Sequence, residues 1–221
     1  MVSFKDVVKD EEILEYIKQS DEVLAALGFT EHGIAHCRLV AELAGQILRD
    51  MGYDERECEL AQIAGLMHDI GNMVNRKDHA HHGALLARDI LIRMNFPPRE
   101  VAKIVSAIGH HDEETAAVVH PVAAALILAD KSDVRRSRVR DRSGENLYTD
   151  IHDRVNYAVR KSGLRVIAEE RLIRLSIEID TKVCPMLEYF EIFLERMILS
   201  KKVALYLDHS FELLINNTRL L

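Results

Sequence analysis

A histidine and an aspartate stand side by side where an apolar helical run ends, in the stretch GLMHDIG at residues 65–71. The neutral imidazole of His68 offers one nitrogen lone pair, and the ionised carboxylate of Asp69 can chelate one cation or bridge two. Because adjacent side chains on a helix diverge by one helical step, the doublet suits a cation, or a close pair of cations, in a cleft beside the helix end. Such a site needs further ligands from other segments.

The chain supplies candidate ligands on both sides of the doublet, since it contains eleven histidines. Seven further histidines, and one aspartate that follows an apolar run, lie in separate predicted helices or turns: His32, His36, His79, His81, His82, His110, His111 and Asp130. Helices joined by short loops pack as antiparallel neighbours, so their ends can converge on one cleft. Nitrogen and carboxylate ligands without thiolate favour divalent transition metals over a sulfur cluster, and more than four candidates exceed one tetrahedral site. We therefore expect one or two ions.

Composition narrows the class of protein. A length of 221 residues fits one domain with a small addition. The formal charge of −7 provides no basic face for DNA. No apolar run approaches the ~18 residues of a membrane helix, and the N-terminus lacks the pattern of a signal peptide. We expect a cytoplasmic protein without a DNA or membrane partner, whose three widely spaced cysteines, Cys37, Cys58 and Cys184, are reduced and buried.

Helical periodicity predicts a run of helices through the first 150 residues. The expected segments are 5–27 with a break at Ser20-Asp21, 30–51, 54–67 with Asp54 as N-cap, 80–94 after Asp78 as N-cap, 99–109 and 121–130. A polar loop over 135–144 carries five arginines, including Arg142. We interpret residues 1–150 as the domain that carries the chemistry.

The pattern of residue types changes after residue 150. Segments rich in β-branched residues predict strands at 155–159, 165–168, 172–179 and 211–215, with turns at 161–163 and 169–171 and a helix over 186–207. We interpret 151–221 as a small α+β appendage without the chemistry. Its exposed strand edges make a homodimer an expected partner arrangement.

The order of the candidate ligands resembles the HD-domain superfamily of metal-dependent phosphohydrolases over roughly residues 30–135. The shared pattern is His36, then His-Asp-Ile-Gly at 68–71, His79 ahead of Gly83-Ala84, His110-His111, and Ala129-Asp130. The resemblance implies a mainly α fold, an HD-domain helical bundle with the small C-terminal α+β appendage. It also implies metal ligation by His36, His68, Asp69 and Asp130, with Asp69 bridging when two ions bind. His79 and either His110 or His111 would complete a second site, and His82 is the alternative to His79.

One branch of that superfamily does not match. The branch that hydrolyses cyclic diguanylate would carry lysine after the HDIG motif and Gly-Tyr-Pro after the paired histidines. Here Asn72 follows Gly71, and Asp112-Glu113-Glu114 follows His111. The resemblance is therefore to HDIG-type proteins outside the HD-GYP branch.

The expected activity is hydrolysis of a phosphoester or phosphoanhydride, with a nucleotide as the small phosphorylated substrate. A bimetal site lowers the pKa of a bound water and clamps phosphoryl oxygens. Iron or manganese is the expected metal, with zinc, nickel, cobalt or magnesium as alternatives. Asp69 would orient the hydroxide. His32 would be an extra metal ligand, donate a proton to the leaving oxygen, or hydrogen-bond a ligand. Candidate phosphate contacts are Lys77 and Lys131, and Asp133 is a candidate for orienting a ligand.

Three other functions fit the same residues. The fold can retain a metal and sense nucleotides without turnover, it can support a di-iron oxygenase, or it can be a structural remnant without metal. Phosphate release, oxygen consumption and metal content distinguish these classes.

Overall fold

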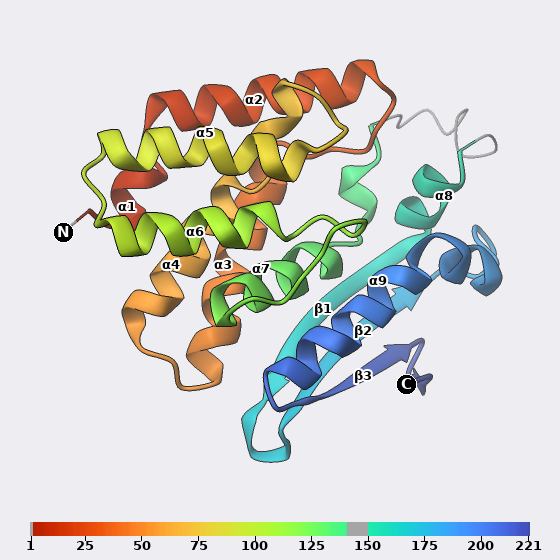
Figure 1. Cartoon of the computed structure of the whole chain (residues 1–221). Coiled ribbons are helices and arrows are strands. Elements are labelled where there is room, and N and C mark those ends of the chain that lie inside the picture. The colour runs from red at the N-terminus through yellow and green to blue at the C-terminus, as the bar shows by residue number, and fades with distance from the viewer. Residues whose placement is uncertain (1, 141–149) are drawn as a thin grey trace.

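The computed structural model describes residues 2–140 and 150–221, and it shows a helical part followed by a small sheet with two helices (Figure 1). The helical part comprises α1 (Phe4–Val7), α2 (Glu11–Ala26), α3 (Ile34–Asp50), α4 (Glu55–Met67), η1 (Ile70–Met73), α5 (His79–Arg93), α6 (Pro98–Gly109), α7 (Pro121–Ser132) and η2 (Arg136–Arg138). The predicted fold class is confirmed. Arg142 and the end of the predicted arginine-rich loop lie outside the described residues.

The first helical segment breaks at a different place from the prediction. The break falls at residues 8–10, where the Asp10 carboxylate caps α2 by accepting a hydrogen bond from the Ile13 backbone N–H at 3.1 Å. The predicted break at Ser20-Asp21 is wrong, because Ser20 is buried and its hydroxyl donates to the Ile70 carbonyl oxygen at 3.0 Å. Serine often caps helices, but here the Ser20 side chain connects α2 to the segment after the His-Asp doublet through this hydrogen bond.

The core of the helical part lies where α3, α4 and α7 pack together. All residues of α7 from Val122 to Ala129 are buried, which explains why this segment is apolar on every side. Gly65 on α4 allows close approach of α3, because a Cβ there would lie 2.7 Å from the Ala41 Cα. Asp130 thus stands at the end of the most buried helix of the domain.

The predicted N-cap of α4 is present, and it allows a stability prediction. The Asp54 carboxylate accepts a hydrogen bond from the Glu57 backbone N–H at 3.0 Å. We expect Asp54→Ala to lower the free energy of unfolding by about 1 kcal/mol in urea denaturation. Asp54→Ser retains an acceptor and should lose far less, so an equal loss in both variants would argue against the cap.

The C-terminal part contains α8 (Ile151–Ala158), β1 (Val159–Ile167), η4 (Ala168–Glu170), β2 (Leu172–Ile179), α9 (Met186–Tyr206), β3 (Ser210–Ile215) and β4 (Thr218–Arg219). The strand order is β1-β2-β3-β4, with β1 antiparallel to β2, β2 parallel to β3, and β3 antiparallel to β4. Helix α9 connects the parallel pair and packs against both β3 and α7 (Figure 1). It therefore joins the sheet to the helical part.

Two local predictions in this part are wrong, whereas β2, α9, β3 and the turn at 169–171 are confirmed. Residues 155–158 belong to α8, because Asp150 caps that helix by accepting from the backbone N–H groups of His152 and Asp153. Residues 161–163 do not turn but continue β1, where Gly163 lies opposite Ser176. The division at residue 150 and the homodimer stay predictions. Within residues 2–140 and 150–221, none of the helices has the length and apolar character needed to span a bilayer.

Candidate metal centre

The ends of five helices converge on one buried cluster of histidines and aspartates. His36 lies in the first turn of α3, His68 and Asp69 follow α4, His79 begins α5, His111 follows α6, and Asp130 lies in the last turn of α7. Five of these residues are at most 3% exposed: His36, His68, Asp69, His79 and His111. Packing of antiparallel helices joined by short loops thus brings together candidate ligands that are spread over about 95 residues of sequence, from His36 to Asp130.

Each of the four imidazoles is fixed by a hydrogen bond from its Nδ1–H group. The acceptors are Asp133 Oδ2 for His36 at 2.7 Å, the Gly65 carbonyl for His68 at 2.8 Å, the Arg76 carbonyl for His79 at 3.2 Å, and the Ile108 carbonyl for His111 at 2.6 Å. An acceptor at Nδ1 selects the tautomer whose Nε2 carries the lone pair. Four Nε2 atoms are therefore prepared as metal ligands.

These Nε2 atoms meet in two pairs. The His36 and His68 Nε2 atoms are 3.3 Å apart, and so are the His79 and His111 Nε2 atoms. Two lone pairs at this distance repel unless a proton or a cation lies between them. Tetrahedral ligands ~2.1 Å from an ion lie about 3.4 Å from one another, so the spacing fits a shared cation at each pair.

Asp69 lies between the two pairs and directs one carboxylate oxygen to each. Its Oδ2 is 3.3 Å from the His68 Nε2 and 3.8 Å from the His36 Nε2. Its Oδ1 is 3.5 Å from the His79 Nε2 and 3.9 Å from the His111 Nε2. One carboxylate is thus placed to bridge two cations.

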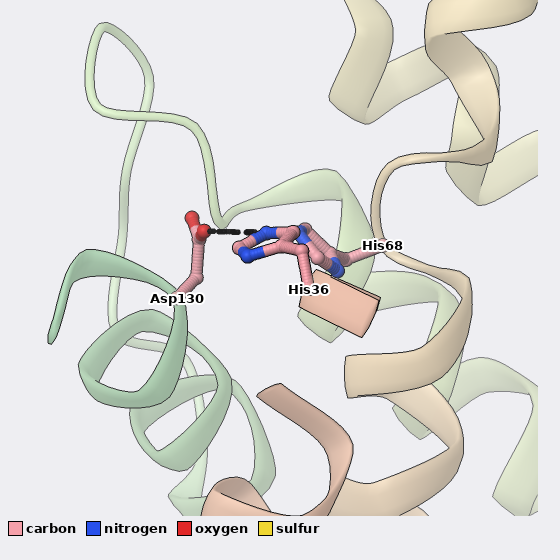
Figure 2. Close-up of side chains that lie close together, drawn as sticks. All are labelled: His36, His68 and Asp130. Carbon is pink, nitrogen blue, oxygen red and sulfur yellow. Dashed lines mark hydrogen bonds and ion pairs between the residues drawn. The ribbon is translucent and has the colours of Figure 1, made fainter. Parts of the chain in front are cut away.

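Asp130 completes the first group of ligands. Its Oδ1 is 3.4 Å from the His36 Nε2 and 3.7 Å from the His68 Nε2, and Figure 2 shows this carboxylate facing the two imidazoles. His36, His68 and Asp130 form one set whose ligand atoms lie within 4.8 Å of one another, and His68, Asp69 and His111 form a second. Both sets contain nitrogen and oxygen donors without sulfur, which suits divalent transition metals.

The electrostatics of the cluster favour ionised carboxylates. Burial alone would raise the pKa values of Asp69 and Asp130, but His68 lowers that of Asp69, and Lys131 with His36 and His68 lowers that of Asp130, well below the usual range. Burial likewise opposes charge on His68, but the two carboxylates outweigh it and raise its pKa to about 10. Burial lowers the pKa of His79 and His111. In the metal-free protein one proton is therefore held on His68, where a cation would otherwise bind.

The raised pKa of His68 predicts a pH dependence of stability for chelator-treated protein. Because the folded-state pKa of about 10 exceeds the unfolded value near 6.5, the stabilisation is complete below about pH 6.5 and is lost as the pH rises toward 10. Between pH 7 and 9 we expect the free energy of unfolding to fall by up to about 1.4 kcal/mol per pH unit. His68→Gln should flatten this slope in urea denaturation, and a wild-type profile that rises over the interval would contradict the assignment.

Several predicted site residues lie near the cluster without joining the two nitrogen pairs. His32 precedes α3, and its ring centroid is 5.4 Å from that of His36. Asp133 accepts the hydrogen bond from His36 and is itself held by Arg135 Nε at 2.7 Å. The Lys131 Nζ is 2.8 Å from the Asp130 Oδ2. Asp133 thus orients His36, and Lys131 neutralises charge on Asp130.

Other predicted residues are placed away from the cluster. His110 directs its Nδ1–H to the Ser106 carbonyl at 2.8 Å, so the structure brings His111 rather than His110 to the site. The His79 Nε2 lies 3.5 Å from the Asp69 Oδ1, whereas His82 lies one turn along α5 and, among the described residues, forms no ion pair with Asp69. Lys77 is exposed in the loop before α5.

The cleft also contains residues that the sequence did not reveal as functional. Asn72 donates from Nδ2 to the Asp69 Oδ1 at 2.9 Å, which fixes the orientation of the Asp69 carboxylate. Four further charged side chains line the cleft: Arg76, Glu113, Arg138 and Arg196. The position of Asn72, directly after the HDIG motif, could have indicated its role from the sequence. Arg196 lies on α9 in the C-terminal part, and no sequence pattern indicated its contact with the cleft.

Comparison with known proteins identifies relatives of this chain. A model described as HD domain matches residues 33–158. An uncharacterized protein of Methanocaldococcus jannaschii is 26% identical over 171 residues, which are 67% of this chain and 65% of that protein. Ribonuclease Y of Campylobacter curvus is 31% identical over 158 residues, 66% of this chain but 29% of the enzyme. The chain thus spans less than two thirds of the length of either relative.

A solved structure is also similar. It is described as a predicted HD superfamily hydrolase from an uncultured Thermotogales bacterium, and it is 29% identical in sequence. The match covers 56% of this chain and 67% of that one, with a TM-score of 0.44.

Proposed function

Because the chain belongs to the HD domain family, we propose that it is a metal-dependent phosphohydrolase that cleaves a phosphoester or phosphoanhydride bond of a nucleotide. The observation that carries this proposal is the arrangement of four Nε2 atoms in two pairs, with one oxygen of Asp69 facing each pair. A metal bound there supplies Lewis acidity toward phosphoryl oxygens and a water of lowered pKa.

Different residues of the cluster would hold the two ions and contact the substrate. His36, His68 and Asp130 would hold one ion, His79 and His111 a second, and Asp69 would contact both. Iron or manganese is the metal we propose. Lys131, buried beside Asp130, would neutralise charge on the substrate phosphate. Asn72 would keep Asp69 in its bridging orientation.

His32 would accept a hydrogen bond at its Nε2 rather than donate a proton there. Its Nδ1–H donates to the Thr30 carbonyl at 2.7 Å, which leaves a lone pair on Nε2. Burial, reinforced by Arg138, lowers the pKa of His32 well below its usual range, so the imidazole is neutral at pH 7. A neutral imidazole at the cleft wall would orient the attacking water by accepting its hydrogen bond.

Phosphate release tests the proposal. The protein would be stripped with chelator, reloaded separately with Mn²⁺, Fe²⁺ or Zn²⁺, and assayed against nucleoside mono-, di- and triphosphates and a short single-stranded RNA, the last because of the similarity to Ribonuclease Y. We expect turnover that disappears with chelator and returns with metal. Binding without phosphate release would favour a nucleotide sensor, and oxygen consumption by the iron form would favour an oxygenase. A cytoplasmic location without a DNA partner stays a prediction.

A further inference from the structure

Two cavities adjoin each other at the cluster of histidines and aspartates. The cluster itself borders a cavity of about 30 Å³, and beside it lies one of about 310 Å³. Four side chains line both: His32, Arg76, Arg138 and Arg196. The outer walls of the larger cavity come from the loop after α2, from α8 and from α9. Its volume is at the lower end of the range for small-molecule sites.

Two of the shared arginines are suited to bind an anion, because they approach the boundary between the cavities from opposite parts of the chain. Arg76 lies in the loop before α5, and among the residues that the structure describes no carboxylate forms an ion pair with it. Its Nη1 donates to the Asn72 Oδ1 at 3.2 Å and lies 3.4 Å from the His79 Nε2. Arg196 on α9 stacks over Phe193 at 4.7 Å, and its Nε lies 2.5 Å from the Glu113 Oε1. Arg138, by contrast, donates to the backbone carbonyls of Glu31 and Asp133 and pairs with the Asp133 carboxylate.

The outer part of the larger cavity has a different character. Phe29 lies in its wall with 41% of its surface exposed, and Arg76 covers part of the ring at 5.4 Å. Two acidic residues, Asp150 and Asp153, also line it, and the Asp150 carboxylate accepts the hydrogen bonds that cap α8. The cavity is thus cationic toward the metal cluster and aromatic and acidic toward its outer end. A ligand that fits carries its phosphate at the inner end and an uncharged, donor-bearing ring at the outer end.

We propose that Arg76 and Arg196 form a phosphate clamp at this boundary, and that the cavity beside it binds the purine or pyrimidine ring of a nucleoside monophosphate against Phe29. This inference rests on the proposed function, because it assigns a substrate class to the same site. It also makes α9 a part of the active site, in contrast to the expectation that residues 151–221 carry no chemistry. The acidic outer end disfavours a ligand with a second phosphate there.

Binding to the chelator-treated 221-residue chain tests the clamp and the ring site without turnover. Isothermal titration calorimetry would compare adenosine 5′-monophosphate with ribose 5-phosphate, which has the phosphate and sugar but no base. We expect the nucleotide to bind about tenfold more tightly, as stacking of one base on an aromatic side chain provides. Phe29→Leu should abolish this difference by weakening only the nucleotide.

The arginines should show a different pattern. Arg196→Gln and Arg76→Gln should each weaken both ligands about tenfold, because each loses a charge-assisted hydrogen bond to the shared phosphate. Lys201→Gln, on an exposed turn of the same helix α9, is the matched control and should change neither affinity. The proposal is overturned if both arginine variants bind both ligands as the wild type does, if Phe29→Leu weakens both ligands equally, or if the wild type binds neither at about 1 mM.

The outcomes separate this inference from the proposed function. If the binding pattern appears but the metal-loaded protein releases no phosphate from any nucleotide, the ring site stands and hydrolysis is excluded. If phosphate is released with the same KM by wild type, Phe29→Leu and both arginine variants, hydrolysis stands and the clamp is rejected.

Discussion

Asp69→Ala is expected to remove metal from the protein and to lower kcat/KM for phosphate release on the order of 1,000-fold, which corresponds to about 4 kcal/mol of transition-state stabilisation. The reason is geometric: the two oxygens of Asp69 face different pairs of histidine nitrogens, so one substitution weakens both positions. Elemental analysis and a phosphate-release assay on the same preparation measure the two effects together.

A matched substitution shows whether the loss is specific. Asp89→Ala removes an aspartate from the exposed face of α5, where its carboxylate pairs with Arg88, and should leave metal content and rate unchanged. Asp69→Asn retains one acceptor oxygen and should lose less metal than Asp69→Ala. An Asp69→Ala protein that kept both its metal and its full rate would exclude the mechanism.

Gly71→Ala is expected to lower the free energy of unfolding by about 3 kcal/mol and to displace His79. A Cβ at Gly71 would lie 2.0 Å from the His79 carbonyl oxygen and 2.4 Å from the Gly83 backbone nitrogen, and both obstacles are backbone atoms that cannot rotate away. The start of α5 must therefore move. Urea denaturation measures the stability, and elemental analysis should show loss of the ion at His79 and His111 before that at His36, His68 and Asp130.

Gly163→Ala provides the control for a glycine without close neighbours. No atom lies within 4 Å of a Cβ built there, so the change in unfolding free energy should stay within about 1 kcal/mol. Equal destabilisation by both substitutions would mean that close backbone approach at Gly71 does not cause the loss of stability in Gly71→Ala. This close packing explains the glycine at position 71, two residues after the His-Asp doublet. Gly71 allows α5 to pack closely against the backbone after α4.

The position of the histidine and aspartate cluster was largely predictable from the sequence, because it depends on helix ends. The doublet after an apolar run, and histidines at the starts or ends of other helices, required only that short-looped helices pack side by side. The choice between neighbouring histidines was not predictable. His110 and His111 follow the same helix, and the turn after Gly109 directs the first to the Ser106 carbonyl and the second to Asp69.

Other features depended on packing that sequence patterns do not contain. Lys77 and Arg76 are adjacent cations, yet Arg76 lines the cleft whereas Lys77 is exposed to solvent. Arg196 reaches the cleft from a helix more than 100 residues after His79, and no local pattern indicates that contact. The β-branched residues at 155–159 predicted a strand, but tertiary packing with a capped N-terminus at Asp150 made most of them helical.

Metal content tests the central claim most directly. The protein would be purified without added metal or chelator and examined by elemental analysis, with the His68→Gln variant alongside. We predict about two equivalents of iron or manganese per wild-type chain, and a clear loss in the variant, since His68 belongs to both ligand sets. A wild-type chain that contains no metal, and takes up none when manganese or iron is added, would contradict the assignment of this cluster as a metal centre.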